Sequence, residues 1–123
     1  ADELVGWLSS DPTGSQDPDY LIIGDMNSYR YEDPIRAFEK GGYKEMIDQQ
    51  GTIYPYSYEY KGQWGLLDHM LASSSLAGQV TGTSIWHINA DESTEFGYNG
   101  RWSSPDVYRC SDHDPLIAGI SLS

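Results

Sequence analysis

The pattern of apolar and polar positions predicts short helices and strands that alternate along the chain. Leu4, Val5 and Leu8 share one face of a predicted helix, which begins without a visible capping residue. Residues 11–19 contain two prolines and one glycine, and this composition predicts a turn-rich connection. The apolar run 20–23 is the best candidate for a buried strand, and it leads directly into a loop at Asp25.

The next segment has clear helix-start and helix-stop signals. Asp33 is a candidate N-cap, Pro34 suits the first helical position, and Gly41-Gly42 can end the helix. These signals predict a helix over Ile35 to Lys40. The following residues, Tyr43 to Asp48, predict a short strand.

The middle of the chain predicts a hairpin. Aromatic residues alternate with small or polar ones from Tyr54 to Tyr60, and Lys61-Gly62 predicts the turn. We expect the second arm over Leu66 to Ala72. A further strand is expected over Val80 to Ile88, and the long polar stretch from Asn89 to Cys110 predicts a loop of the length that often carries function.

Composition and charge restrict the classes of protein. A chain of 123 residues without a linker or repeat predicts one domain, and 38% apolar residues argue against disorder. The net charge of −12 repels a nucleic-acid backbone, so a nucleic-acid ligand would need metal ions. The single cysteine, Cys110, excludes an internal disulfide and a clustered-thiolate zinc site. The sequence contains no run of 18 apolar residues, so it predicts no membrane span.

Two acidic motifs lie beside apolar runs, Gly24 to Asn27 near the start and Ser111 to Pro115 near the end. Rigid sheets present reactive loops in this way. Asp25 and Asn27 are two residues apart, so we expect them to project from one side of an extended segment. A carboxylate can orient or deprotonate water, and an amide can donate to an oxygen that gains negative charge. The alternative is that both residues only form a turn.

The second motif supplies a stronger pair of candidates. Asp112 offers hard oxygen ligands for a divalent cation, and His113 can donate a proton to a phosphoryl oxygen. Asp68 lies inside the apolar stretch 66–71, where an ionised carboxylate is costly to bury unless it is paired. We expect His113 to be its partner, because His69 points to the opposite face of the strand. The alternative for the second motif is a turn that starts a strand.

These motifs, in this order, resemble the deoxyribonuclease I-like endonuclease/exonuclease/phosphatase superfamily. That group also shows Gly-Asp-apolar-Asn, then Asp on an apolar strand, then Ser-Asp-His with Pro two residues on. The sequence is most similar to its bacterial extracellular nucleases, in the stretches Asp33-Pro34-Ile35, Leu67-Asp68-His69, Trp86 to Glu92 and Tyr108-Arg109.

The resemblance implies that residues 1–123 are the carboxyl-terminal half of a catalytic domain. It implies an α/β (α+β) fold, half of a four-layer αββα sandwich, with one mixed, mainly antiparallel sheet and helices on one face. The family's amino-terminal half supplies an Asn and a Glu that complete the metal site. We therefore expect this chain to have little or no activity alone, and we expect its bare apolar sheet face to favour self-association.

The resemblance also implies residue roles. Asp25 resembles the residue that activates water, Asn27 the donor that stabilises the pentacovalent phosphate, and Asp112 a metal ligand. His113 resembles the histidine that contacts the scissile phosphate, held by Asp68, and its role as acid, base or electrostatic stabiliser is left open. The implied cofactor is Mg2+ or Mn2+, sometimes with Ca2+.

The implied substrate is nucleic acid, with DNA and RNA both open, and the implied location is extracellular, as in secreted bacterial nucleases. Two alternatives stay open beside the nuclease. One is a phosphatase or lipid phosphodiesterase of the same superfamily, with the same site residues and different loops. The other is a non-catalytic, acidic, metal-binding extracellular module.

Overall fold

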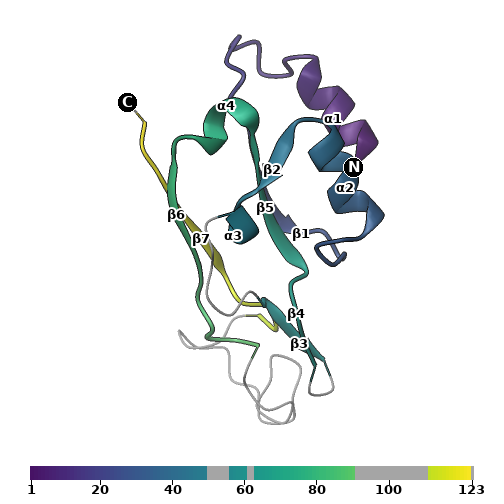
Figure 1. The fold of residues 1–123 in the computed structure, drawn as a ribbon, viewed down its shortest axis with the longest axis vertical. Helices are drawn as coiled ribbons and strands as arrows, with labels where there is room; N and C mark the ends of the chain where they lie inside the picture. Colours follow the sequence, from purple (N-terminus) through teal and green to yellow (C-terminus); the bar gives the residue numbers. More distant parts are fainter. Residues whose placement is uncertain (50–55, 61–62, 91–110, 123) are drawn as a thin grey trace.

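The computed structural model describes residues 1–49, 56–60, 63–90 and 111–122. Its helices and strands are, in chain order, α1 (Asp2–Ser9), β1 (Leu21–Asp25), α2 (Asp33–Lys40), β2 (Tyr43–Glu45), α3 (Met46–Gln49), β3 (Tyr58–Tyr60), β4 (Gln63–Gly65), β5 (Asp68–Ser73), α4 (Ser74–Ala77), β6 (Val80–Ile85) and β7 (Leu116–Ile120). The described strands form three antiparallel ladders, with the orders β1-β5-β2, β3-β4 and β6-β7 (Figure 1).

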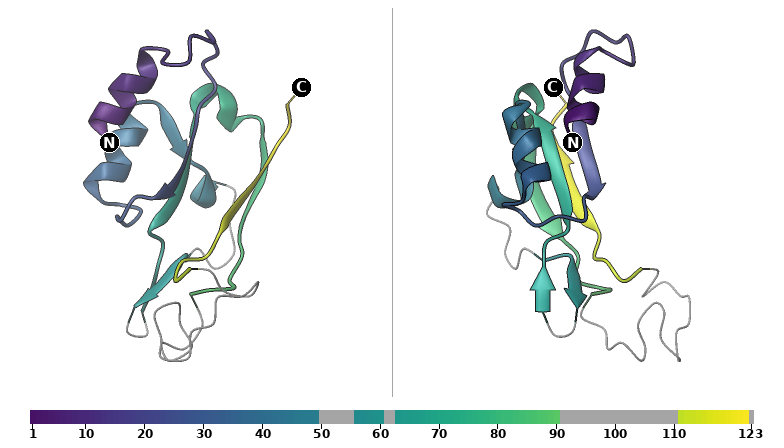
Figure 2. Two further views of the ribbon diagram at one scale, coloured as in Figure 1. Left: turned by 180° about the vertical axis from the view of Figure 1, so that it is seen from behind. Right: turned by 90° about the vertical axis from the view of Figure 1, so that its right-hand side faces the viewer.

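Strand β5 lies at the centre of the core and is apolar on both faces. Met70 and Ala72 belong to a buried cluster that also contains residues of α3, α4 and β6. Leu71, which points the other way, packs with Ile22 of β1 and Phe38 of α2. Figures 1 and 2 accordingly show β6 and β7 on one side of β5, and α1 and α2 on the other.

The α/β fold class with antiparallel sheets and few helices is confirmed. The single expected sheet is instead divided into three ladders within the described residues. The helix α1 and the strands β1 and β7 lie at the apolar segments that the sequence indicated. The prediction of β1 as a buried strand was wrong, because Ile22 is buried while Leu21 and Ile23 are exposed. Within the described residues, no helix has the length and apolar character needed to cross a bilayer.

The second helix begins earlier than expected. Asp33 is its first residue and Glu32 is the N-cap, with no hydrogen bond from a side-chain cap, so the prediction of Asp33 as the cap was wrong. A carboxylate in the first turn still interacts favourably with the helix dipole. Gly41 is the C-cap, and Gly42 has φ of +91°, so the helix ends at the predicted glycine pair.

The predicted hairpin has a different second arm. Strand β3 pairs with β4, whereas β5 pairs with β1 and β2. The predicted turn, residues 61–62, lies outside the described part of the chain. The prediction of residues 66–72 as the hairpin arm was wrong because β5, which begins at Asp68, is the central strand of the β1-β5-β2 sheet and has both faces buried. Residue 54, where the first arm was expected to begin, lies outside the described part of the chain, and β3 starts at Tyr58.

Two further strand predictions were too long. The segment 43–48 divides into β2 and the short helix α3, and β6 ends at Ile85 rather than at residue 88. Of the predicted loop from Asn89 to Cys110, residues 91–110 lie outside the described part of the chain. The assignment of residues 1–123 to one half of a domain stays a prediction.

Candidate active site

Three segments that are distant in sequence meet at one end of the fold. Asp25 is the last residue of β1 and Asp68 the first of β5, and the register of the two strands places them opposite each other. His113 precedes β7 and forms an isolated bridge with Tyr58 of β3. The pairing of the strands therefore brings the two acidic residues and the histidine together.

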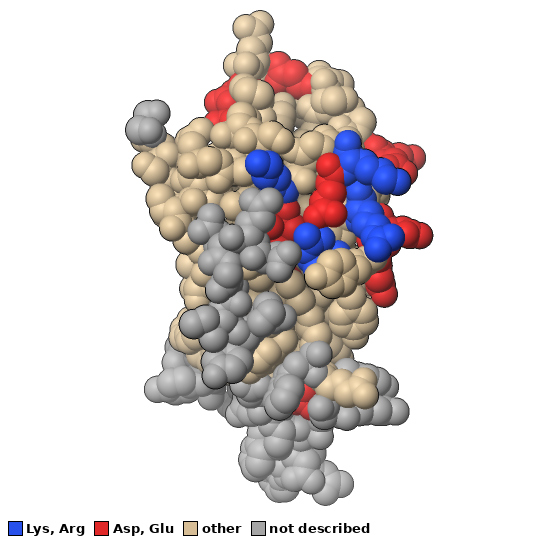
Figure 3. All heavy atoms as spheres, in the orientation of Figure 1, with Lys and Arg blue, Asp and Glu red and all other residues tan. Residues whose placement is uncertain are grey.

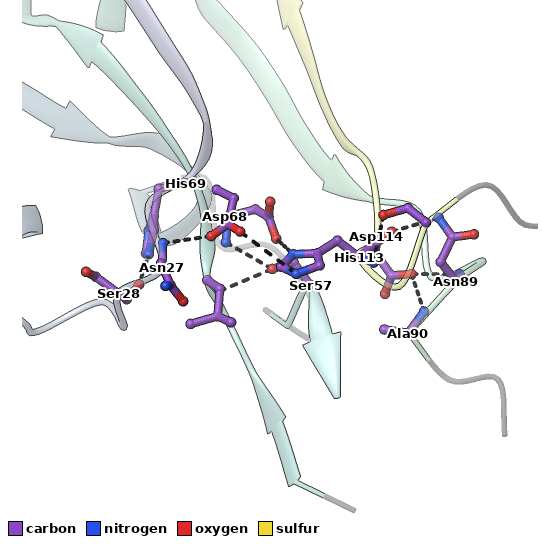
Figure 4. A network of polar contacts seen from close by, with 12 residues as sticks. Asn27, Ser28, Ser57, Asp68, His69, Asn89, Ala90, His113 and Asp114 are labelled. Carbon is purple, nitrogen blue, oxygen red and sulfur yellow. Dashed lines mark hydrogen bonds and ion pairs between the residues drawn. The ribbon is translucent and has the colours of Figure 1, made fainter. Parts of the chain in front are cut away.

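The Asp68 carboxylate holds the His113 ring. Asp68 Oδ2 accepts a hydrogen bond from His113 Nδ1 at 2.6 Å (Figure 4). Asp25 Oδ2 lies 4.0 Å from His113 Nε2. The predicted contact between Asp68 and His113 is present. His69 lies on the opposite face of β5, where it is fully buried.

These carboxylates also affect the charge of His113. Burial lowers the pKa of His113, but the hydrogen bond to Asp68 and the negative charges of Asp68, Asp25 and Asp112 outweigh burial and raise the pKa above its ordinary 6.5. Because folding raises this pKa, the stabilisation from the charged ring is complete below pH 6.5. It is lost as the pH rises through the pKa of the folded state.

We expect the His113 ring of the metal-free protein to titrate above pH 6.5 in an NMR experiment that follows its carbon-bound protons. Asp68→Asn should shift the midpoint to lower pH, because the variant loses the negative charge and keeps the burial. Asp33→Asn on α2 is the matched control and should leave the midpoint unchanged. A midpoint at or below 6.5 in the unsubstituted protein would contradict the expected direction.

The loop after β1 has a tighter geometry than expected. Asp25 Oδ1 accepts a hydrogen bond from the Asn27 backbone N–H at 2.7 Å, and Asn27 has φ of +48°. The prediction that both residues project from an extended segment was wrong, because the strand ends at Asp25 and an Asx turn follows it. Asparagine tolerates this left-handed conformation better than most residues do.

His69 supports this loop from the buried side. Its Nε2 donates to the Ser28 carbonyl oxygen at 2.7 Å, and its Nδ1 lies 3.7 Å from Glu45 Oε1. Both His69 and Glu45 are buried. Successive residues of β5 therefore serve the two halves of the site: Asp68 holds the histidine, and His69 holds the loop that carries Asp25.

Sequence reasoning missed the role of Ser57. This buried serine accepts hydrogen bonds at Oγ from the backbone N–H groups of Leu67 and Asp68, at 3.2 and 3.1 Å. Its carbonyl oxygen accepts from the Asp114 N–H at 2.7 Å. Ser57 thus joins the start of β5 to the loop of His113, although a small polar residue among alternating tyrosines gives no signal of this.

Asp114, the buried neighbour of His113, is a second residue that was missed. Its Oδ1 accepts hydrogen bonds from the backbone N–H groups of Asn89 and Ala90, at 2.8 and 2.9 Å, and its Oδ2 contacts His87 Nδ1 at 2.9 Å. The Asn89 side-chain amide donates to the His113 carbonyl oxygen at 2.7 Å. Asp114 therefore anchors the segment 87–90, which in turn holds the His113 backbone (Figure 4).

Carboxylate oxygens and a ring nitrogen are available for a cation. Among the described residues, ligand atoms of Asp25, Asp68 and His113 lie within 4.8 Å of one another. Asp112 is exposed and is not part of this group, so its role as a metal ligand stays a prediction.

No protein-family model and no curated protein matches the sequence. Solved structures do match its fold. A mannosyl-6-phosphatase from Bacteroides thetaiotaomicron matches with a TM-score of 0.67 and 15% identity, over 98% of this chain and 44% of that chain. A 3'-5' exonuclease from Neisseria meningitidis matches with a TM-score of 0.64 and 17% identity, over 97% of this chain and 51% of that chain.

An endonuclease/exonuclease/phosphatase family protein from Leptotrichia buccalis matches with a TM-score of 0.57 and 13% identity, over 97% of this chain and 42% of that chain. At these identities the similarities establish the fold. This chain therefore has the fold of the endonuclease/exonuclease/phosphatase proteins, over about half the length of the solved chains that it matches.

Proposed function

We infer that this chain is part of a divalent-metal-dependent phosphodiesterase that hydrolyses nucleic acid. The observation that carries the proposal is the grouping of Asp68, His113 and Asp25, with one ring nitrogen held at 2.6 Å and the other 4.0 Å from a second carboxylate. The Asp25 side chain is 49% exposed and that of His113 is 23% exposed. A phosphate group can therefore approach both from solvent.

Each residue has a distinct role in this proposal. Asp25 orients or deprotonates the attacking water, and the Asn27 amide donates to a phosphate oxygen as negative charge develops. His113, with its raised pKa, presents a positively charged Nε2–H to the scissile phosphate. Asp68 fixes the orientation of the ring and stabilises its charged form, as the carboxylate does in other carboxylate-histidine pairs.

The donor set fits Mg2+, Mn2+ or Ca2+, all of which prefer oxygen ligands. Asp68 Oδ2 and His113 Nδ1 are already engaged with each other, and Asp25 is assigned to the attacking water, so we propose Asp112 as the residue of this chain that would hold the ion. A bound divalent ion would neutralise charge locally at the acidic site, so that a chain with a net charge of −12 could still hold an anionic phosphodiester.

The strands of the described fold expose apolar side chains. Leu21 and Ile23 on β1 are 37% and 50% exposed, and Ile117 on β7 is 51% exposed. This chain also spans only 42 to 51% of the matched solved chains. We therefore propose that a further half of the domain covers these strands and completes the metal site, and that the isolated chain self-associates.

The proposal predicts metal-dependent cleavage by the full-length protein. Oligonucleotides of DNA and RNA should be hydrolysed in Mg2+ or Mn2+, and EDTA should abolish turnover because the charge on the phosphate is then unbalanced. The purified 123-residue chain should show little or no turnover under the same conditions. Gel electrophoresis of end-labelled substrates measures both, and substantial cleavage by the chain alone would contradict the proposed division of the site.

A phosphatase is the second candidate, favoured by the similarity to the mannosyl-6-phosphatase. The same preparation should be assayed on 4-nitrophenyl phosphate, mannose 6-phosphate and sphingomyelin. A preference for one of these over nucleic acid would replace the nuclease proposal with a phosphatase or lipid phosphodiesterase. Absence of hydrolysis of every substrate would support a non-catalytic metal-binding module. The extracellular location stays a prediction.

A further inference from the structure

Two exposed tyrosines follow the Asn27 loop directly. Tyr29 and Tyr31 are 54% and 73% exposed, which is unusual for large aromatic side chains. Their backbone is well defined: the Tyr29 N–H donates to Glu32 Oε2 at 3.1 Å, and the Glu32 N–H donates to the Tyr29 carbonyl oxygen at 3.0 Å. The two rings therefore project from an ordered turn and not from a loose end.

The Tyr29 ring is connected to His113 by contacts through the β3-β4 ladder. It packs on the backbone of Gly65, so closely that a β-carbon at Gly65 would collide with the ring. Gly65 pairs with Tyr58 in the β3-β4 ladder, and the Tyr58 ring lies 4.7 Å from the His113 ring, centroid to centroid. The β3-β4 strand pair thus lies between the exposed Tyr29 ring and the proposed phosphate position at His113.

The charge of this region differs from that of the rest of the chain. Residues 29–44 contain four basic and three acidic side chains, whereas the whole chain has a net charge of −12. Figure 3 shows the described basic side chains gathered around α2 and β2. Arg30 pairs with Glu39 at 2.9 Å and lies 5.4 Å from the centre of the Tyr31 ring, while the other basic residues are exposed: Arg36, Lys40 and Lys44.

We propose that this tyrosine-basic surface, Tyr29 and Tyr31 with Arg36, Lys40 and Lys44, binds a single-stranded nucleic acid whose scissile phosphate lies at His113. Exposed aromatic rings stack on unpaired bases regardless of sequence, and exposed cations attract the phosphates that connect them. Bases within a duplex are already stacked on each other and leave no face for the tyrosines. The inference rests on the proposed phosphodiesterase function and deepens it by naming the form of the substrate.

The test compares Tyr29→Ala/Tyr31→Ala with the parent in the full-length protein. We expect the alanine pair to lower kcat/KM for a single-stranded 12-nucleotide substrate. Each stacked base that is lost, at about 1–3 kcal/mol, corresponds to a fall of roughly 5- to 150-fold. Tyr29→Phe/Tyr31→Phe should restore the parent value, because phenylalanine keeps the ring. Trp7→Ala is the control for an exposed aromatic elsewhere, and it should leave kcat/KM unchanged.

Two further measurements separate this inference from the proposed function. Hydrolysis of bis(4-nitrophenyl) phosphate by the parent tests the phosphodiesterase itself. The Kd for a fluorescein-labelled single strand, measured by anisotropy, tests the surface whether or not the strand is cleaved. An alanine pair that binds the single strand as tightly as the parent would overturn the inference, as would a parent that prefers the matched duplex.

The basic residues have their own readout in the same binding assay. Arg36→Gln/Lys40→Gln/Lys44→Gln removes three positive charges, and glutamine keeps a good helix-forming side chain at the two positions on α2, Arg36 and Lys40. The slope of log Kd against log salt concentration should fall by about 0.7 for each phosphate contact that is lost. An unchanged slope would remove these three residues from the proposed surface.

Discussion

His113→Ala in the full-length protein is expected to lower kcat/KM for phosphodiester hydrolysis by about 10²–10⁴-fold, the usual contribution of a positioned proton-transfer group. The physical reason is the geometry around the ring, with Nδ1 held by Asp68 at 2.6 Å and Nε2 facing the Asp25 side of the site. Initial rates on an oligonucleotide, with circular dichroism to verify folding, measure the effect.

A double-substitution cycle tests whether Asp68 acts through His113. Asp68→Asn alone should also lower kcat/KM, but adding it to His113→Ala should cause little further loss, since residues that act as a unit are not additive. The matched control is Asp33→Asn, an exposed carboxylate on α2, which should leave the rate unchanged. Additive losses would show that Asp68 acts independently. A His113→Ala variant as active as the parent would show that His113 does not take part in the hydrolysis.

The residues of this central group could be predicted because each gives a local signal. Asp68 lies in an apolar run where an ionised carboxylate needs a partner, and strand alternation directs His69 away from it. This reasoning favoured His113 over His69 as the partner without any three-dimensional information. The apolar runs beside Asp25 and His113 likewise fixed the positions of β1 and β7.

Other features could not be predicted because they depend on contacts between distant segments. Residues 66–72 have no alternation, since β5 is buried on both faces, so the sequence did not reveal that β1 and β2 are its neighbours. Ser57 and Asp114 form hydrogen bonds to backbone groups, and a backbone group carries no trace in the sequence. The supporting residues were therefore missed, while the contact between Asp68 and His113 was predicted.

The support from Asp114 predicts the largest effect on stability. Asp114→Ala removes a fully buried carboxylate, which accepts hydrogen bonds from the Asn89 and Ala90 N–H groups and contacts His87. At about 1–3 kcal/mol for each buried group left without a partner, the two backbone N–H groups correspond to a loss of about 2–6 kcal/mol in the free energy of unfolding. Urea denaturation of the full-length protein measures this loss as a lower midpoint.

Asp114→Asn and Asp33→Ala distinguish the role of the hydrogen bonds from that of the charge. The asparagine keeps an oxygen that can accept from both backbone N–H groups, so its loss should be smaller than that of Asp114→Ala. Asp33→Ala removes an exposed carboxylate from the first turn of α2 and should cost less than about 1 kcal/mol.

Because the Asn89 side chain also holds the His113 carbonyl oxygen, Asp114→Ala should lower kcat/KM even at temperatures where the protein remains folded. Equal stability of the two Asp114 variants would instead show that the negative charge, and not the pair of backbone hydrogen bonds, is what this position contributes.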